Sequence, residues 1–408
     1  MLRLQRARCL LAIAAGFSAA GIRSQAVDAS DVLVYSIGEV RVRPHVALAE
    51  QYDDNIFYRS SHTNSISRFP AESDFITTIS PGVSVQLGRR EANHLTLDYT
   101  MDQSWYLDHR DEGHSDHSVL FNTFLEGYRL SLTGNDHVQF LSGILGGGQN
   151  LGQKVDRFTF SDDYRLDYRL GEKTSVYLAG DFSATDYEKG TPLYDENTIR
   201  GTGGFSFKAT EKTSVFGELY YGQSATDPNT NGVGFAKGPH ADFFGGFVGA
   251  RGDFTSRLKG SVKAGYESRQ YSDGTPASSS PVVEATLDQR FSDRTLASLT
   301  YTRRNSLSVQ VARQAYTSDA VGAQIRQVLS SDGKFVVVVA GNFENDDYER
   351  SVLSAARHDR VYRANLGLTY NIQLWLSARL GYQFEKYDSN VVIDYHVNSV
   401  TLSIQVGY

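Results

Sequence analysis

The sequence predicts an all-β protein, a transmembrane up-and-down antiparallel β-barrel of about eighteen strands with short periplasmic turns and longer extracellular loops. Three observations lead to this fold class. Long segments alternate between apolar and polar residues, the connections between them alternate between short and long, and the chain ends on an alternating strand with an aromatic last residue. Composition agrees, because 46 Tyr and Phe and 37 Gly accompany only 8 Pro, a balance that favours strands and tight bends.

The N-terminal segment is expected to be cleaved from the mature protein. Three arginines within residues 1–8 precede an apolar stretch of about a dozen residues, too short to span a bilayer. The stretch Ser24-Gln25-Ala26 then supplies a small-x-small cleavage pattern. We expect a signal peptide over residues 1–26, although cleavage after Ala20 and an uncut anchor are alternatives. A short periplasmic segment (27–39) and the barrel (40–408) follow.

The strand pattern is clearest in HLTLDYTMDQSWYLD, residues 94–108, where leucine and aromatic residues occupy every second position. Such alternation is typical of a strand with one apolar and one polar face. The run exceeds the usual strand of about five or six residues and suffices for a tilted strand that crosses hydrocarbon, about nine to eleven residues. A soluble β-sandwich or β-helix would use shorter strands. Closing the sheet into a barrel leaves no unpaired strand edge in lipid. The alternation then places the leucines toward lipid and the aspartates toward water inside the barrel.

The same alternation recurs along the chain, and the connections set the strand count. Short polar turns are predicted at 88–93, 133–136, 171–174, 210–213, 255–257, 292–295, 330–334 and 371–373. Longer loops are predicted at 53–72, 109–116, 146–156, 189–195, 226–241, 272–280, 305–315, 346–358 and 388–395. Eight turns and nine loops join eighteen strands and place both chain ends on the short-turn side, as in bacterial outer-membrane barrels. Strand boundaries are ambiguous at 117–134 and 296–330.

The polar rows of these strands are the candidate lining of a lumen, since inward residues tune a pore. Their charges are mixed in sign, so neither purely anionic nor purely cationic solutes are favoured. Interleaved charges with inward tyrosines suit hydrogen bonding and stacking on sugars, whereas cross-strand pairing with each other is the simpler structural interpretation. The candidates are Asp98, Asp102, Tyr106, Arg165, Asp167, Arg169, Tyr177, Lys263, Glu267, Arg269, Arg363, Arg379 and Glu385. The long loops 53–72 and 226–241 are expected to constrict such a lumen.

Catalysis is not expected. The only candidate pairs of a nucleophile or acid with a base are His117 with Ser118 and His137 with Asp136, and adjacent strand residues point to opposite faces. The loop HRDEGHSDH (109–117) matches no metal-ligand spacing, and GGGQNLGQK (146–154) lacks the ending of a phosphate-binding loop. A single cysteine, Cys9, excludes a disulfide framework. A net charge of −7 provides no surface for nucleic acid. We therefore expect no metal, cofactor or nucleic acid.

Two stretches resemble a known family. The C-terminal VTLSIQVGY, with Leu402, Ile404, Val406 and Tyr408, looks like the terminal signal that the barrel assembly machinery recognises. The stretch VRPHVALAEQYDDNIF (42–57) and the recurring [DE]-[KR]-T turns resemble the putative beta-barrel porin 2 family over roughly residues 40 to 408. That resemblance implies a Gram-negative outer-membrane barrel, often associated with exopolysaccharide secretion.

The expected function is therefore a porin-like conduit that exports exopolysaccharide through the outer membrane. An uptake porin for general or small solutes, and a structural or adhesive barrel with a blocked lumen, are the alternatives. The expected partners are outer-membrane lipid and lipopolysaccharide, the barrel assembly machinery, periplasmic polysaccharide-export proteins and polysaccharide.

Overall fold

A computed structural model of the chain describes residues 33–60, 70–89, 93–146, 152–228, 240–272, 277–310, 314–350, 355–391 and 394–407. These residues form nineteen strands and one short 3-10 helix, Arg110–Glu112. The strands are β1 (Tyr35–Ile37), β2 (Val40–Asp53), β3 (Asp74–Gly88), β4 (His94–Tyr106), β5 (His114–Glu126), β6 (Leu130–Leu141), β7 (Arg157–Arg169), β8 (Thr174–Tyr187), β9 (Tyr194–Lys208), β10 (Thr213–Pro228), β11 (His240–Asp253), β12 (Leu258–Tyr271), β13 (Ser278–Ser292), β14 (Thr295–Leu307), β15 (Ala315–Val328), β16 (Phe335–Tyr348), β17 (Arg357–Gln373), β18 (Leu376–Ser389) and β19 (Tyr395–Val406).

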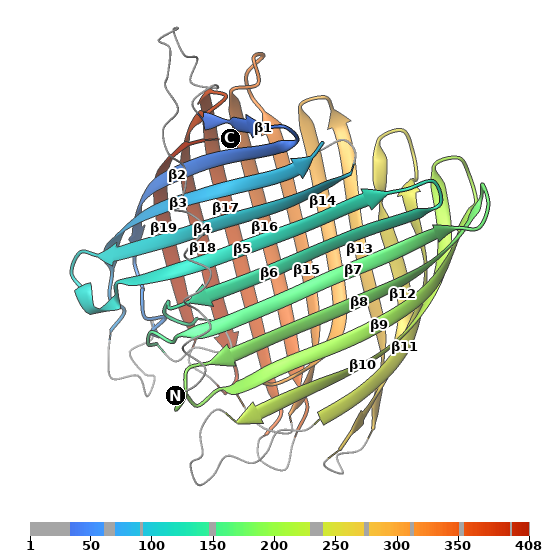
Figure 1. Cartoon of the computed structure of the whole chain (residues 1–408). Helices are drawn as coiled ribbons and strands as arrows, with labels where there is room; N and C mark the ends of the chain where they lie inside the picture. The colour runs from blue at the N-terminus through green and yellow to red at the C-terminus, as the bar shows by residue number, and fades with distance from the viewer. Residues whose placement is uncertain are drawn as a thin grey trace, which may run out of the picture.

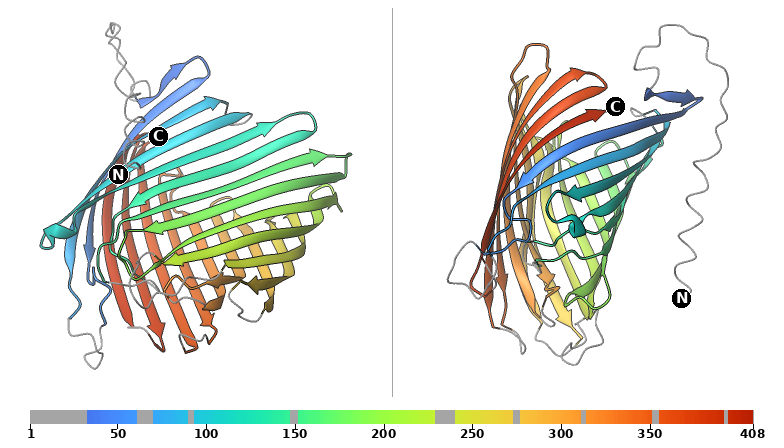
Figure 2. Two further views of the ribbon diagram at one scale, coloured as in Figure 1. Left: turned by 60° about the horizontal axis from the view of Figure 1, so that its bottom comes forward. Right: turned by 90° about the vertical axis from the view of Figure 1, so that its left-hand side faces the viewer.

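Eighteen of these strands, β2 to β19, close into one antiparallel barrel. Each strand pairs with the next along the chain, and β19 returns to pair with β2 through Ser399–Val406 and Val46–Asp53. Figure 1 shows the wall of β2 to β11 in front of the steeper strands β12 to β19, and Figure 2 shows β2 beside β19 where the barrel closes. The three-residue strand β1 adds a hairpin to β2 and is not part of the closed ring. The predicted fold class is confirmed.

The connections alternate as expected, with two short turns placed wrongly. The turn predicted at 133–136 lies inside β6, and the real connection between β5 and β6 is Gly127–Arg129. The error arose because large apolar residues occupy both phases of 117–134, so that the alternation gave no boundary there. The turn predicted at 371–373 is also displaced, because β17 continues to Gln373 and the turn is Leu374–Trp375. The ambiguous region 296–330 contains β14 and β15.

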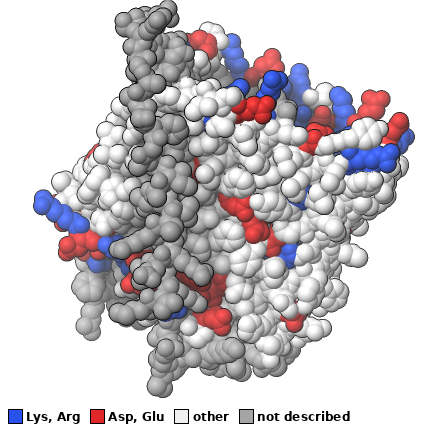
Figure 3. All heavy atoms as spheres, in the orientation of Figure 1, with Lys and Arg blue, Asp and Glu red and all other residues white. Residues whose placement is uncertain are grey.

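The outer face of the wall is a band of exposed apolar side chains. Leu178 on β8, Leu219 on β10 and Val248 on β11 are 66%, 75% and 71% exposed, and all three lie on the same register phase. Figure 3 shows this face as largely uncharged, with charged side chains gathered along its upper edge, where short turns lie in Figure 1. A protein in water would not leave so large an apolar surface open, so lipid covers it. Within the described ranges, no helix has the length and apolar character that crossing a bilayer requires.

Acidic residues interrupt this band at several places, and one of these is a facing pair. Asp136 on β6 and Asp162 on β7 are direct cross-strand partners on the outward phase, and a few acidic atoms appear in the middle of the face in Figure 3. Asp136 accepts a hydrogen bond from the Tyr164 hydroxyl at 2.6 Å, and Asp162 accepts one from the backbone N–H of Phe182 at 3.1 Å. The misplaced turn at 133–136 had assigned Asp136 to a connection.

The predicted signal peptide (1–26) lies outside the described residues, as does the last residue of the predicted assembly signal, Tyr408. The other three members of that signal, Leu402, Ile404 and Val406, form the outward row of β19. The predicted segment 27–39 contributes β1 in its described part. The domain limits and the signal remain predictions.

Candidate functional site

The residues expected to line the lumen all lie on inward rows of the register. The inward phase follows from the opposite rows, which carry the exposed apolar side chains. The candidates come from β4 (Asp98, Asp102, Tyr106), β7 (Arg165, Asp167, Arg169), β8 (Tyr177), β12 (Lys263, Glu267, Arg269), β17 (Arg363) and β18 (Arg379, Glu385). Their role in transport remains a prediction.

Most of these charges pair with inward neighbours, as the simpler structural interpretation had it. The pairs are Arg165 Nε with Asp167 at 2.7 Å, Arg269 Nε with Glu267 at 2.6 Å, Arg363 Nε with Glu385 at 2.8 Å, and Lys263 Nζ with Glu218 at 3.0 Å and Glu284 at 3.1 Å. Arg169 pairs with Glu126 at 3.1 Å. Asp98, Asp102 and Arg379 make no ion pair with any described residue. The inner wall thus presents both signs of charge.

An aromatic layer lies under some of these charges. Tyr177 on β8 is 2% exposed, and Phe243 and Phe247 on β11 are equally well buried. Cations cover their faces: the Arg165 guanidinium lies 3.6 Å from the Tyr177 ring centre, and Lys263 Nζ lies 4.3 Å from that of Phe247. The rings are therefore occupied by protein cations. A solute in the lumen meets the charged groups first, and the expected stacking of a sugar on Tyr177 has no open ring face in this arrangement.

The long-loop mouth of the barrel is crossed from one side by the β2–β3 loop. Asn55 anchors it, since its side-chain amide donates to the carbonyls of Arg59 at 2.8 Å and of His396 on β19 at 2.9 Å. Tyr58 then turns inward with a φ of 51° and packs edge-on against Tyr395, at 5.2 Å between ring centres. Such a backbone conformation is unusual for a tyrosine and persists only where packing holds it. Residues 54–60 of the loop expected at 53–72 therefore fold inward.

The β14–β15 loop crosses the mouth from another side. The Val309 carbonyl accepts a hydrogen bond from the backbone N–H of Tyr194 at 2.8 Å, although β14 and β9 stand five strands apart around the barrel. Gln314 is 1% exposed and donates to the carbonyls of Glu349 and Ala355 at 3.0 and 3.1 Å. This inward fold was not expected from the sequence. The other loop predicted to constrict the lumen, 226–241, lies largely outside the described residues.

A small apolar cluster joins the β6–β7 and β8–β9 loops. Leu145 and Val155 from the β6–β7 loop pack with Tyr187 and Leu193, which flank the β8–β9 loop. Gly146 lies against Tyr58, because a Cβ added there would stand 2.5 Å from the Tyr58 ring. We call Tyr58, Leu145, Leu193, Val309 and Gln314 the mouth layer.

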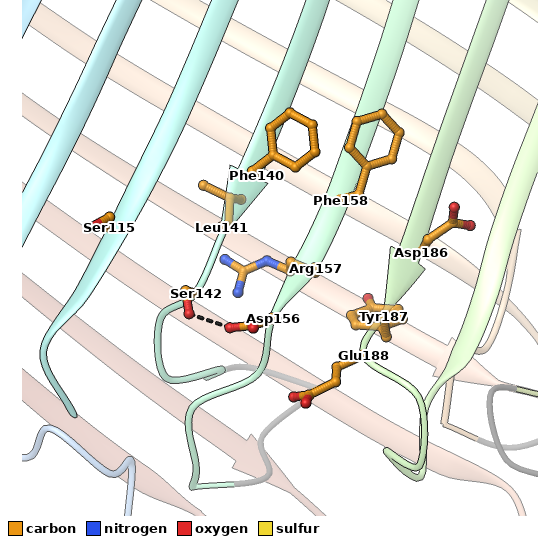
Figure 4. Close-up of a pocket in the computed structure, with 10 residues that line it drawn as sticks. All are labelled: Ser115, Phe140, Leu141, Ser142, Asp156, Arg157, Phe158, Asp186, Tyr187 and Glu188. Atoms are coloured by element: carbon orange, nitrogen blue, oxygen red, sulfur yellow. Dashed lines mark hydrogen bonds between the residues drawn. The ribbon is translucent and has the colours of Figure 1, made fainter. Parts of the chain in front are cut away.

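A shallow pocket of about 440 Å³ opens at the rim beside this cluster. In Figure 4, Ser142 and Asp156 meet in a hydrogen bond from the two ends of the β6–β7 loop. Phe140 and Phe158, which also line the pocket, lie on outward rows with ring centres 5.0 Å apart. The pocket therefore sits at the edge of the wall, away from the passage.

A histidine holds the base of the β2–β3 loop. His109 contacts Glu72 through Nε2 at 2.7 Å and Asp74 through Nδ1 at 2.8 Å, and Arg59 also pairs with Glu72. The hydrogen bonds to Glu72 and then to Asp74 raise the pKa of His109 above its ordinary value. His109 therefore joins the β4–β5 loop to the β3 end of the β2–β3 loop, and Arg59 joins the first part of that loop to the same Glu72.

The residue pairs considered for catalysis are separated by the wall. His117 points outward and contacts the Tyr99 hydroxyl at 2.9 Å, whereas Ser118 points inward. Ser118 Oγ instead lies 3.0 Å from His137 Nε2 on β6. No described carboxylate contacts the other ring nitrogen of His137. Among the described residues no group of three or more His, Cys, Asp or Glu side chains is arranged to hold a metal ion.

Sequence reasoning missed the residues that fix the mouth layer. Tyr58, Val309 and Gln314 lie in loops, where alternation gives no orientation. One signal was available: Tyr58 and Tyr395 are aromatic residues in or beside long loops, which favours packing over solvent exposure.

Solved barrels provide a comparison. The outer membrane protein OpdK from Pseudomonas aeruginosa matches at 8% identity over 90% of this chain and 99% of its own, with a TM-score of 0.46. OpdL from Pseudomonas aeruginosa matches at 13% identity over 90% and 99%, with a TM-score of 0.44. The siderophore receptor PirA from the same organism matches at 7% identity over 90% and 80%, with a TM-score of 0.43. Since each score lies below 0.5, no property of those proteins is carried over.

No curated protein matches the chain. The model of one protein family, described as putative beta-barrel porin 2, matches residues 34–408, which span β1 to β19. The resemblance read from residues 42–57 and from the turns is thereby confirmed. The closed barrel, its apolar outer band and its polar inner rows are those of an outer-membrane porin, and this chain belongs to the putative beta-barrel porin 2 family.

Proposed function

We propose that this porin is a passive pore for small hydrophilic solutes, with a size limit set by the mouth layer. The observation that carries the proposal is the 2.8 Å hydrogen bond between Tyr194 N–H and the Val309 carbonyl, which ties a loop to a strand five positions away. A passage crossed in this way admits solutes only through the space left on either side. Inward polar residues such as Asn135, Gln324 and Gln383 are exposed, which supports a hydrated path.

Export of an exopolysaccharide is the second candidate, and it rests on the family resemblance. A polymer would have to thread past Tyr58 and Val309, so this function requires the mouth layer to move aside. Periplasmic export proteins would then supply both the polymer and the energy, since nothing in a passive barrel drives a chain outward. A third candidate, a structural barrel whose lumen stays blocked, requires the mouth layer to remain closed to every solute.

Liposome swelling separates the three. The purified barrel is reconstituted into vesicles, and swelling is followed in a series from a monosaccharide to long dextrins. Passive passage of small solutes predicts fast swelling with the monosaccharide and none with the dextrins. Entry of long dextrins would overturn the proposed size limit, and no swelling with any sugar would favour the blocked barrel. Loss of surface polysaccharide from cells that lack the gene would favour export.

The route to the membrane is part of the proposal. Removal of residues 1–26 and recognition of the terminal strand by the assembly machinery would deliver the barrel to the Gram-negative outer membrane, where lipid and lipopolysaccharide cover its apolar band. N-terminal sequencing of the purified barrel tests the cleavage site. A first residue other than Val27 would show that the protein is cleaved at a different position from the one proposed.

A further inference from the structure

Two adjoining cavities lie in the long-loop half of the lumen. They measure about 280 and 160 Å³ and share Ser183, Thr198, Arg269 and Asn305 among their lining residues. The larger cavity reaches from Ser161 on β7 to β14, so it extends across the interior. We call the two cavities together the chamber.

One group of charges in the chamber is fixed by its own contacts. The Arg269 guanidinium donates to Glu267 at 2.6 Å, to the Asn305 carbonyl at 2.9 Å and to Ser224 Oγ at 3.5 Å. Glu267 also accepts from the Tyr220 hydroxyl at 3.1 Å. These groups satisfy one another's hydrogen bonds, which holds their side chains in place on one wall of the chamber.

Asp181 and Arg200 also line the larger cavity and pair with each other at 2.9 Å. Two further charged side chains in the chamber have no such partner. Arg304 on β14 lines the larger cavity and is exposed to it, and Glu196 on β9 lines the smaller one. Neither makes a hydrogen bond or an ion pair with any described residue. The two cavities adjoin through four shared lining residues, so both side chains border the chamber.

A guanidinium in one cavity and a carboxylate in the adjoining one match a solute that carries a negative group at one end and a positive group at the other. We propose that the chamber binds small solutes that carry both a carboxylate and an ammonium group, as free amino acids do. The carboxylate meets the Arg304 guanidinium, which suits it in bidentate geometry, and the ammonium meets Glu196. A cavity of about 280 Å³ lies just below the usual volume of ligand sites, which suits a small solute. This inference rests on the proposed pore and names a solute class for it.

Three small probes that carry the two charged groups together or singly test the site. L-serine carries both groups, lactate only the carboxylate and ethanolamine only the ammonium. Binding to the detergent-solubilised barrel is measured by titration calorimetry. We expect serine to bind more tightly than either lactate or ethanolamine. Arg304→Gln and Glu196→Gln should each weaken serine binding roughly ten- to a hundred-fold, the worth of a hydrogen bond between charged groups.

The matched control is Arg326→Gln. Arg326 also points into the lumen, near the short-turn end of β15, and makes no ion pair with a described residue. Its loss should leave serine binding unchanged, and circular dichroism confirms that each variant is folded. Equal binding of lactate and serine, an Arg304→Gln variant with unchanged affinity, or no binding of serine would overturn the assignment.

Vesicle flux separates this inference from the proposed function. Serine binding without any sugar or serine flux would overturn the pore and leave the site standing. Sugar flux without serine binding would overturn the site and leave the pore standing. Both results together, with serine flux reduced in Arg304→Gln and Glu196→Gln but not in Arg326→Gln, are expected.

Discussion

The two ends of the lumen are built from the same strands and differ in what covers them. Toward the long-loop end, inward side chains such as Arg357, Asp359 and Tyr387 are almost fully buried. Toward the middle and the short-turn end, inward residues such as Gln324 and Gln383 remain exposed. The exception there is the Tyr177 ring, which is buried beneath Arg165. Alternation is equally regular in both regions, so the strands alone do not produce the difference. Loops that fold over the long-loop end remove water from groups that would otherwise be solvated.

The largest expected effect comes from breaking one ion pair in each region. The side chains of Arg269 and Glu267 are each 8% exposed, whereas those of Arg165 and Asp167 are 26% and 28% exposed. Glu267→Ala leaves a buried cation without its partner and should lower the free energy of unfolding by about 3–5 kcal/mol. Asp167→Ala should cost no more than about 1 kcal/mol.

Denaturant titration of both variants in detergent micelles measures these costs. Each variant is compared with the wild-type barrel under identical conditions. Similar losses for the two variants would contradict the view that burial by the loops distinguishes the two ends.

The next effect tests the mouth layer directly. Tyr58→Ala removes the ring that packs against Tyr395 and Gly146. We expect a loss of about 2 kcal/mol in unfolding free energy, below the value for a fully buried aromatic residue, and faster liposome swelling with sugars near the size limit. Tyr128→Ala is the control, because Tyr128 lies in a short turn and is 89% exposed. An unchanged size limit in Tyr58→Ala would remove Tyr58 from the constriction.

Much of the barrel could be predicted from residue order alone. Period-two alternation places every inward candidate, from Asp98 to Glu385, because a strand side chain has only two faces to choose from. The prediction was wrong where alternation itself was absent: with Leu and Phe in both phases of 117–134, the turn at Gly127–Arg129 was displaced onto β6.

The mouth layer could not be predicted in the same way. Val309 is held by the backbone of Tyr194, a contact between segments more than a hundred positions apart in the chain. Loop residues have no periodic constraint, so the pattern that fixes Glu267 on an inward row says nothing about which way Tyr58 turns. The sequence therefore predicts the strands that form the wall of the passage, but not the loops that cross its mouth.

A smaller effect depends on pH. Because hydrogen bonds to Glu72 and Asp74 raise the pKa of His109, the folded protein holds the imidazole proton more tightly than the unfolded chain does. This contribution is complete below the unfolded pKa, about 6.5, and is lost as pH rises through the raised folded pKa. We expect the loss to be at most about 1 kcal/mol, since these groups are partly exposed.

Unfolding free energies measured from about pH 5 to pH 9 test this linkage. The difference between wild type and His109→Gln should shrink as pH rises, because glutamine does not titrate. A difference that stays constant over the whole range would mean that the charge of His109 does not hold the β2–β3 loop.

The last comparison concerns two residues on one inward row of β18. Tyr387 is 1% exposed and donates its hydroxyl to Asp359 at 2.6 Å, whereas Gln383, four residues nearer the short-turn end, is exposed. Tyr387→Phe removes one buried hydrogen-bond donor and should cost about 1–3 kcal/mol. Gln383→Ala should change the unfolding free energy by less than about 0.5 kcal/mol. The two residues share one strand and one face. Equal costs for the two variants would therefore mean that the boundary between the two regions does not lie between these residues.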